Sequence, residues 1–133
     1  MTDAEKDLEI RAIFAAYGAA FDDADAEGVT ELFAWPSVIW QLGHGHVFDD
    51  PEDLGENVEA LLEVFGEAGI VITTPTILDL KIGSCAAFAT VAWRQENAEG
   101  EAMHEFTCHY MLIDDDGTWR IATVVNEPES VTH

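Results

Sequence analysis

The chain has 133 residues, of which 48% are hydrophobic, so it is long enough to bury the core of a single domain over residues 1–133. Its 27 Asp and Glu residues outnumber its five Lys and Arg residues, which gives a net charge of −22 at pH 7. A surface of this sign repels phosphate backbones and anionic lipids, so neither nucleic-acid binding nor membrane binding is expected.

Other features of the sequence bear on the cellular compartment of the protein. No apolar run approaches the roughly 20 residues that cross a bilayer. The acidic segment MTDAEKDLEI lacks the basic and apolar regions of a signal peptide. Cys85 and Cys108 are the only cysteines, they form no CxxC pair, and both lie in or beside apolar strand-like runs. We therefore expect a cytoplasmic protein in which both cysteines are reduced.

Two helices are predicted in the first part of the chain. Residues 4–24 form an amphipathic helix, because apolar side chains recur there at helical spacing. Asp25 can cap a second helix that continues to about Phe33, and Trp35-Pro36 ends it. The apolar stripe of the first helix contains Ile10, Ile13, Phe14, Tyr17 and Phe21.

A strand over residues 37–42 follows, and GHGH after it is a turn or a loosened continuation of the strand. Asp50 and Pro51 mark the start of a third helix, because an N-cap carboxylate followed by proline is typical of helix N-termini. This helix ends near Gly69. Its buried side chains are Leu54, Val58, Leu61, Leu62 and Phe65.

Four strands are predicted in the second half of the chain. Pro75 marks a bend or a sheet edge, because proline cannot donate to a strand ladder. Helices that precede antiparallel strands indicate the α+β class. The strands cover residues 70–82, 86–95, 103–114 and 119–126, with turns at 97–100 and at Asp116-Gly117.

Three segments carry a resemblance to a known family. They are the short helix EGVTELFAWP, the strand VIWQL and the hairpin EAMHEFTCHYMLIDDDGTWRIATVVN. In this order, after an aromatic first helix, they resemble the nuclear transport factor 2-like superfamily, which includes SnoaL-like polyketide cyclases, ketosteroid isomerases and scytalone dehydratases. The resemblance implies a cone-shaped, curved antiparallel sheet with three helices from the N-terminal half over one face. Because this scaffold carries many unrelated activities, function has to be argued from a site.

The strand that starts at Met103 indicates that both faces of the sheet are covered. One face carries His104, Phe106, Cys108, Tyr110 and Leu112, and the other carries Met103, Glu105, Thr107, His109, Met111 and Ile113. The second set mixes polar and apolar side chains, whereas a solvated face should alternate more cleanly. A second subunit is the simplest cover for that face, so we expect a homodimer. Sheet-mediated dimers are also what the resemblance implies.

The aromatic side chains predict an interior that binds a small apolar or aromatic molecule, with no cofactor. The resemblance also places the strand that contains Trp40 near the cavity. A histidine could add a polar group to such a wall. The candidate ligand-binding residues are Tyr17, Trp40, His44, Phe65, Trp93, His109 and Tyr110.

His44 and His46 have several interpretations. In an extended segment they project to the same face as Trp40 and Leu42. They could form a metal pair with Asp50 as a third ligand, stand as exposed hairpin imidazoles, or supply a hydrogen-bond donor or general base. A cupin would need a second glycine- and histidine-bearing motif near the C-terminus, which is lacking, so no metal site is assigned.

No acid–base pair can be assigned from the remaining ionisable residues. His104 and His109 differ in parity, so at most one of them faces the cavity. Glu105 and Asp79 lie in strands. Asp79 shares its strand face with Lys81, so we expect the Asp79 side chain to face solvent. The sequence therefore predicts a small-molecule-binding domain. The alternative is a cofactor-free isomerase, dehydratase or cyclase that uses a cavity histidine with a carboxylate or a tyrosine.

Overall fold

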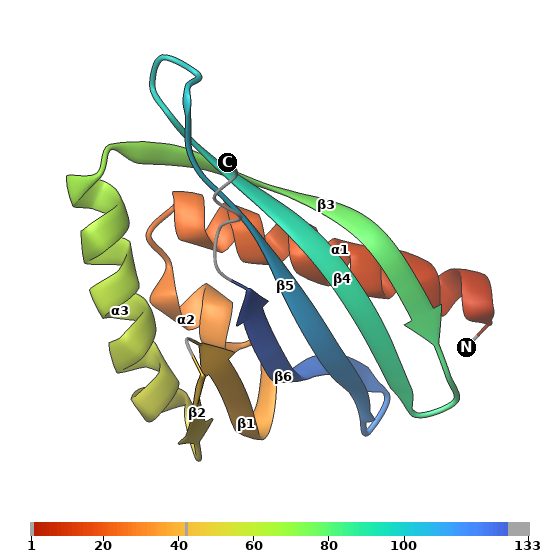
Figure 1. Cartoon of the computed structure of the whole chain (residues 1–133). Coiled ribbons are helices and arrows are strands. Elements are labelled where there is room, and N and C mark those ends of the chain that lie inside the picture. The colour runs from red at the N-terminus through yellow and green to blue at the C-terminus, as the bar shows by residue number, and fades with distance from the viewer. Residues whose placement is uncertain (1, 42, 128–133) are drawn as a thin grey trace.

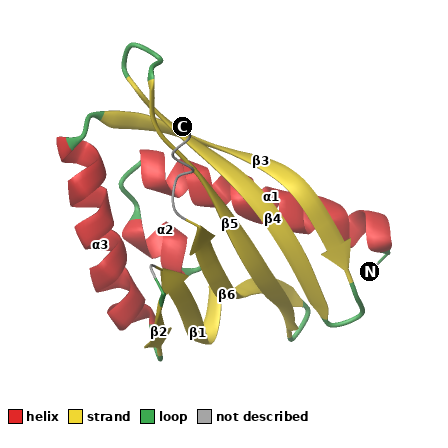
Figure 2. Ribbon diagram, viewed as in Figure 1, coloured by secondary structure: helices red, strands yellow, loops and turns green. Residues whose placement is uncertain are grey.

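The structure is a computed structural model that describes residues 2–41 and 43–127. These residues form three helices, α1 (Asp3–Asp22), α2 (Ala26–Thr30) and α3 (Pro51–Glu67). The strands join into one curved, open sheet in the order β2-β1-β6-β5-β4-β3, and the helices lie over one face of it (Figures 1 and 2). The strands are β1 (Phe33–Gln41), β2 (His44–Phe48), β3 (Ile70–Ile82), β4 (Ala86–Asn97), β5 (Ala102–Asp115) and β6 (Thr118–Glu127).

The predicted α+β class and the helix-covered curved sheet are confirmed. One pairing differs from an antiparallel sheet, because β1 runs parallel to β6. The other neighbours in the sheet are antiparallel, as expected. Four strands and α3 separate β1 from β6 in the chain, so no hairpin forces these two strands to run in opposite directions.

Local capping explains where the longer helices begin. Thr2 and Glu5 form a capping box at α1, with Glu5 N donating to Thr2 Oγ1 at 3.1 Å and Thr2 N donating to Glu5 Oε1 at 3.2 Å. At α3, Asp53 N donates to Asp50 Oδ1 at 2.9 Å, as the predicted N-cap requires. Gly69 follows α3 with φ of 77°, a left-handed conformation that glycine adopts at low cost.

The segment after α2 departs from the prediction. The sequence predicts a helix to about Phe33 that Trp35-Pro36 ends, but α2 stops at Thr30, and Trp35 and Pro36 both lie inside β1. Pairing with β6 explains the difference, because Ile121 N donates to Leu32 O at 2.9 Å and holds the chain in the sheet. Tertiary pairing thus overrides a helix of low intrinsic stability.

The GHGH segment is split between a turn and a strand. Gly43 has φ of 77°, and β2 begins at His44 and pairs with β1. The predicted strand over 37–42 therefore lies within a longer β1 that reaches Gln41, while Leu42 lies outside the described residues.

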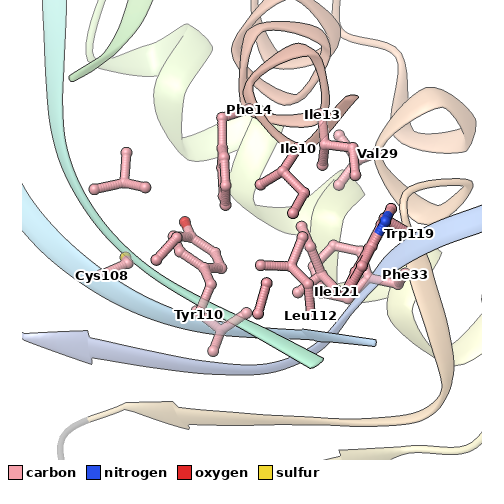
Figure 3. Packing of buried hydrophobic residues seen from close by; sticks show 14 of the residues in the cluster. Ile10, Ile13, Phe14, Val29, Phe33, Cys108, Tyr110, Leu112, Trp119 and Ile121 are labelled. Atoms are coloured by element: carbon pink, nitrogen blue, oxygen red, sulfur yellow. The ribbon is translucent and has the colours of Figure 1, made fainter. Parts of the chain in front are cut away.

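The core lies between α1 and the helix-covered face of the sheet. Figure 3 shows Ile10, Ile13 and Phe14 of α1 facing Tyr110 and Leu112 of β5. The rings of Phe14 and Tyr110 have centroids 4.8 Å apart. Full burial of one such aromatic or aliphatic side chain contributes about 1.5–3 kcal/mol to folding. Through these contacts, the predicted apolar stripe of α1 packs against the inner face of the sheet.

The C-terminal half of α1 approaches the edge strand β3 closely. Gly18 is buried, and a Cβ at this position would lie 2.7 Å from Thr73 O. β3 is an edge strand, which confirms the edge position predicted for Pro75. Within the described residues, no helix has the length and apolar character needed to cross a membrane.

Gly18→Ala should lower the free energy of unfolding by roughly 1–3 kcal/mol, because the added methyl group meets a backbone oxygen that cannot rotate away. Gly66→Ala in α3 is the matched control, since a Cβ there meets nothing within 4 Å. It should raise the stability by up to about 1 kcal/mol through helix propensity. Urea denaturation of the parent and both variants measures the two changes. Similar stabilisation by both substitutions would contradict the close approach of α1 to β3.

Candidate ligand-binding site

A cavity of about 120 Å³ lies between α1, α3 and the inner face of the sheet. An engineered apolar cavity of about 150 Å³ holds benzene, so this space suits a group of single-ring size. Most of its lining is apolar or aromatic, and the polar part consists mainly of carboxamides. The lining residues are Tyr17, Phe21, Ile39, Gln41, Asn57, Leu61, Phe65, Thr73, Trp93, Gln95, Phe106, Cys108, Tyr110, Val124 and Asn126.

Aromatic rings from three elements pack around the cavity. Tyr17 stacks on Phe21 of the next turn of α1, with ring centroids 5.1 Å apart. Tyr17 also lies 5.4 Å from Trp93 of β4, and Phe21 lies 5.7 Å from Phe65 of α3 in an edge-to-face arrangement. Such pairs contribute about 0.5–1.5 kcal/mol each beyond the burial of their area. The same contacts therefore hold α3 against α1 and shape the wall of the cavity.

A directed chain of hydrogen bonds crosses the inner face of the sheet. Trp93 Nε1 donates to the Tyr110 hydroxyl at 2.8 Å. Tyr110 in turn bonds Cys108. The thiol has a single proton and gives it to Asn126, so the phenol is the donor to the sulfur. Cys108 Sγ then donates to Asn126 Oδ1 at 3.6 Å. The chain runs from Trp93 through Tyr110 and Cys108, and it ends on the oxygen of the Asn126 carboxamide.

These groups stay uncharged near neutral pH. Burial raises the pKa of Tyr110 well above its ordinary value, and the neighbouring Tyr17 and Cys108 add to the effect. Burial likewise raises the pKa of the Cys108 thiol to about 11. Tyr17 also has a pKa raised by burial, with a smaller contribution from Cys108. Two phenols and one thiol therefore line the cavity as neutral hydrogen-bonding groups.

A second hydrogen bond fixes the Gln95 carboxamide. Gln95 is 1% exposed, and its Oε1 lies 3.1 Å from Nδ1 of His104, its cross-strand partner on β5. The oxygen accepts, so this geometry places the proton of His104 on Nδ1. His104 supports a lining residue without lining the cavity itself.

Four of the seven candidate residues line the cavity together, namely Tyr17, Phe65, Trp93 and Tyr110. Trp40 does not, which corrects the placement that the resemblance implies. Ile39 and Gln41 of β1 line the cavity, and strand alternation sends Trp40 to the opposite face, where it is 47% exposed. The ring of Trp40 covers Gly45 across the hairpin instead, because a Cβ on Gly45 would lie 2.9 Å from it.

His44 lies outside the cavity lining and is exposed. The shared face predicted for His44, His46 and Trp40 is wrong, because the chain reverses after Gln41. His44 pairs with Gln41 and His46 pairs with Ile39, so both histidines share the face of those residues. In the part of the chain that the structure describes, no group of three or more His, Cys, Asp or Glu side chains could hold a metal ion.

His109 lies on the outer face of the sheet, so it is also outside the cavity lining. Its Nδ1 is 3.1 Å from Thr90 Oγ1, and its Nε2 is 2.6 Å from Glu127 Oε2. The predicted opposite faces of His104 and His109 are confirmed. Glu105 is exposed and pairs with Arg94 at 3.0 Å. Asp79 is exposed, as expected.

The carboxamides are the polar amide groups of the lining that the sequence reasoning misses, and several apolar lining residues are absent from the candidate set as well. Gln95 shares its strand parity with Trp93, and Asn126 shares its parity with Val124, so both are polar side chains at inward positions. A lone inward amide carries no motif, and strand parity is the only signal that could have found either one. No charged side chain belongs to the lining among the described residues.

Comparisons with known proteins agree with this fold. A family model described as NTF2-like protein (DUF6841) matches residues 5–129, so the chain belongs to this NTF2-like family. No curated protein matches the sequence. The resemblance to the nuclear transport factor 2-like superfamily is thereby confirmed.

Solved structures share the fold at low sequence identity. A Nostoc punctiforme protein of unknown function with a cystatin-like fold has a TM-score of 0.81 at 18% identity, covering 97% of this chain and 94% of its own. A protein of unknown function from Mycobacterium tuberculosis has a TM-score of 0.76 at 20% identity, covering 97% and 79%. A ketosteroid isomerase-like protein from Erwinia carotovora atroseptica has a TM-score of 0.71 at 20% identity, covering 93% and 96%. These similarities establish the fold alone.

Tyr110→Phe should lower the free energy of unfolding by about 1–3 kcal/mol, because it leaves the buried Trp93 N–H without its acceptor. Tyr17→Phe is the matched control, since the Tyr17 hydroxyl makes no hydrogen bond to any described residue. It should change the stability by less than about 0.5 kcal/mol. Chemical denaturation followed by Trp fluorescence measures both. A Tyr17→Phe variant that loses as much stability as Tyr110→Phe would argue against the hydrogen-bond chain.

Proposed function

We propose that this NTF2-like chain binds a small, uncharged, apolar or aromatic molecule in the cavity between α1, α3 and the sheet. The observation that carries the proposal is the composition of the wall. Aromatic rings supply most of the contact area, and a few oriented polar groups lie among them. Ligand pockets in proteins typically combine an apolar lining with a small number of fixed polar groups.

The size of the cavity limits the ligand. A volume of about 120 Å³ accommodates one ring or a short branched chain, and a larger molecule would project past Gln41 and Asn57. Both of these lining residues are exposed, so this part of the wall borders solvent. The ligand would bury its apolar end among the aromatic rings and leave the remainder at this opening.

Binding without chemistry is favoured over the alternative of a cofactor-free isomerase, dehydratase or cyclase. Such an enzyme needs a proton acceptor that reaches the substrate. Among the described lining residues there is no histidine and no carboxylate. The buried phenols have raised pKa values and hold their protons, so they are poor bases. One solved neighbour is described as ketosteroid isomerase-like, but that likeness extends to the fold only.

Fluorobenzene is a suitable probe, because it is a single apolar ring with a sensitive fluorine signal. It should bind the parent protein, and Phe65→Ala should weaken binding about two- to tenfold through loss of aromatic contact. Fluorine NMR titration gives both affinities, and circular dichroism checks that the variant is folded.

Trp40→Ala is the control for this titration, because Trp40 is exposed on the opposite face of β1. It should leave the affinity for fluorobenzene unchanged. Absence of any saturable binding to the parent would refute the proposed function.

We also propose that a second copy of the chain covers the outer face of the sheet. Trp40, Val125 and Phe88 are each exposed there, and strand pairing sets Trp40 beside Val125 and Phe88 beside Met111. A chain of net charge −22 repels copies of itself, so self-association requires a face with few charges and much apolar area. The outer face combines these apolar side chains with the Arg94–Glu105 ion pair and the His109–Glu127 hydrogen bond, whose charges are already matched.

Val125→Asp should shift the protein from dimer to monomer at moderate salt, because the new carboxylate would be buried against the partner and the adjacent His109 is already bonded to Glu127. Leu8→Asp is the control, since Leu8 is 69% exposed on α1 and away from the sheet face. Multi-angle light scattering at 0.15 M and 0.5 M sodium chloride measures the mass. A parent that is monomeric at both salt concentrations rules out the dimer.

A further inference from the structure

We propose that the cavity selects a neutral ligand that carries a hydrogen-bond acceptor, such as the oxygen of a ketone, ester, amide or ether. This inference rests on the proposed binding function and specifies the chemistry of the ligand. It follows from the direction of two hydrogen bonds, which use the acceptor atoms of the buried Gln95 and the half-buried Asn126 and leave their amino groups without a partner among the described residues.

Asn126 provides the first free donor. Its Oδ1 accepts the Cys108 thiol proton at 3.6 Å, at the end of the chain that begins at Trp93 Nε1. Each donor in this chain has its own acceptor, so the carboxamide cannot turn over without setting its amino group against the thiol hydrogen. Neither N–H of Asn126 Nδ2 bonds a described residue. The amino group of a cavity-lining amide is therefore available to a ligand.

Gln95 provides the second free donor by the same reasoning. Its Oε1 is bonded to His104 Nδ1 at 3.1 Å, and no other described residue bonds its amino group. The bond keeps its direction if His104 becomes protonated, because Nδ1 carries a proton in the cation as well. His104 is thus a positioning residue that turns the Gln95 amino group away from itself.

Tyr17 adds a hydroxyl that makes no hydrogen bond to a described residue. Burial raises the pKa of this phenol, so it remains protonated and able to donate. Three lining residues from α1, β4 and β6 therefore offer unused donors to one small cavity. Among the described residues, none of these donors is a fully buried side-chain atom that lacks a partner, so they face the open space of the cavity. A ligand oxygen that accepts from one of them gains a hydrogen bond that a hydrocarbon of the same shape cannot form.

The acceptor has to be neutral. All five Lys and Arg side chains, at positions 6, 11, 81, 94 and 120, lie outside the lining, so a carboxylate ligand would have no cation to pair with. The net charge of −22 would also repel it before it entered. Burying an unpaired charge costs far more than a few hydrogen bonds return.

Three six-membered-ring probes separate the possibilities. Cyclohexanone carries the acceptor, methylenecyclohexane has the same shape without it, and cyclohexanecarboxylate carries a charged acceptor. Titration calorimetry on the parent protein should show cyclohexanone binding roughly three- to tenfold more tightly than methylenecyclohexane. No binding of the carboxylate is expected at pH 7. Cyclohexanone should also move the side-chain NH₂ signals of Asn126 and Gln95 in nitrogen-15 correlation spectra.

Two apolar variants test the residues directly. Asn126→Leu and Gln95→Leu should each bring the ratio of the two affinities toward one, whereas Thr90→Val on the outer face should leave the ratio unchanged. If either leucine variant fails to fold, the NH₂ shifts of the parent protein decide the question. Three outcomes would each overturn this inference while the proposed function stands. The ketone and the alkene could bind equally, the carboxylate could bind more tightly, or the ketone could bind and leave both NH₂ signals in place. Failure of fluorobenzene and all three probes to bind overturns both.

Discussion

The packing of α1 across the sheet is the contact on which the rest of the structure depends. Phe14 fills the core against Tyr110, and Tyr17 and Phe21, one and two turns later, reach the cavity. A single apolar stripe therefore builds a solid core at one end and a hollow at the other. Leu61 and Phe65 of α3 form another part of the wall of this hollow.

The polarity inside the cavity is achieved without charge. A chain that already carries −22 would be destabilised further by a buried carboxylate, and a buried cation would need a partner. Carboxamides, phenols and a thiol avoid both costs, provided that each buried polar atom finds a partner. The bonds from Trp93 to Tyr110 and from His104 to Gln95 satisfy part of this requirement inside the protein. In our proposal, the donors that these bonds leave unused select the ligand.

Much of the fold could be predicted because its signals are periodic. The stripe of α1 and the alternation of β4 and β5 place Tyr17, Trp93 and Tyr110 on the inner side before any coordinates are known. Trp40 could not be placed in this way, because its face depends on where β1 starts and where the chain reverses at Gly43. The start of β1 is set by its parallel pairing with β6. That pairing joins residues that are far apart in the sequence, so no local pattern reveals it. The direction of the bonds at Asn126 depends on three side chains from two other strands, so no local pattern predicts it.

The sheet is open, and its two edges differ in how they resist the addition of another strand. β2 is five residues long, which offers little backbone for an intruding strand to follow. β3 is 13 residues long, but it contains Pro75, which has no N–H to extend a ladder, and α1 packs against it at Gly18. Another strand therefore has difficulty adding to either edge of the sheet. At one edge β2 is too short, and at the other Pro75 leaves a gap in the row of N–H donors. The face-to-face dimer proposed above would therefore form without opening an edge-to-edge route to fibrils.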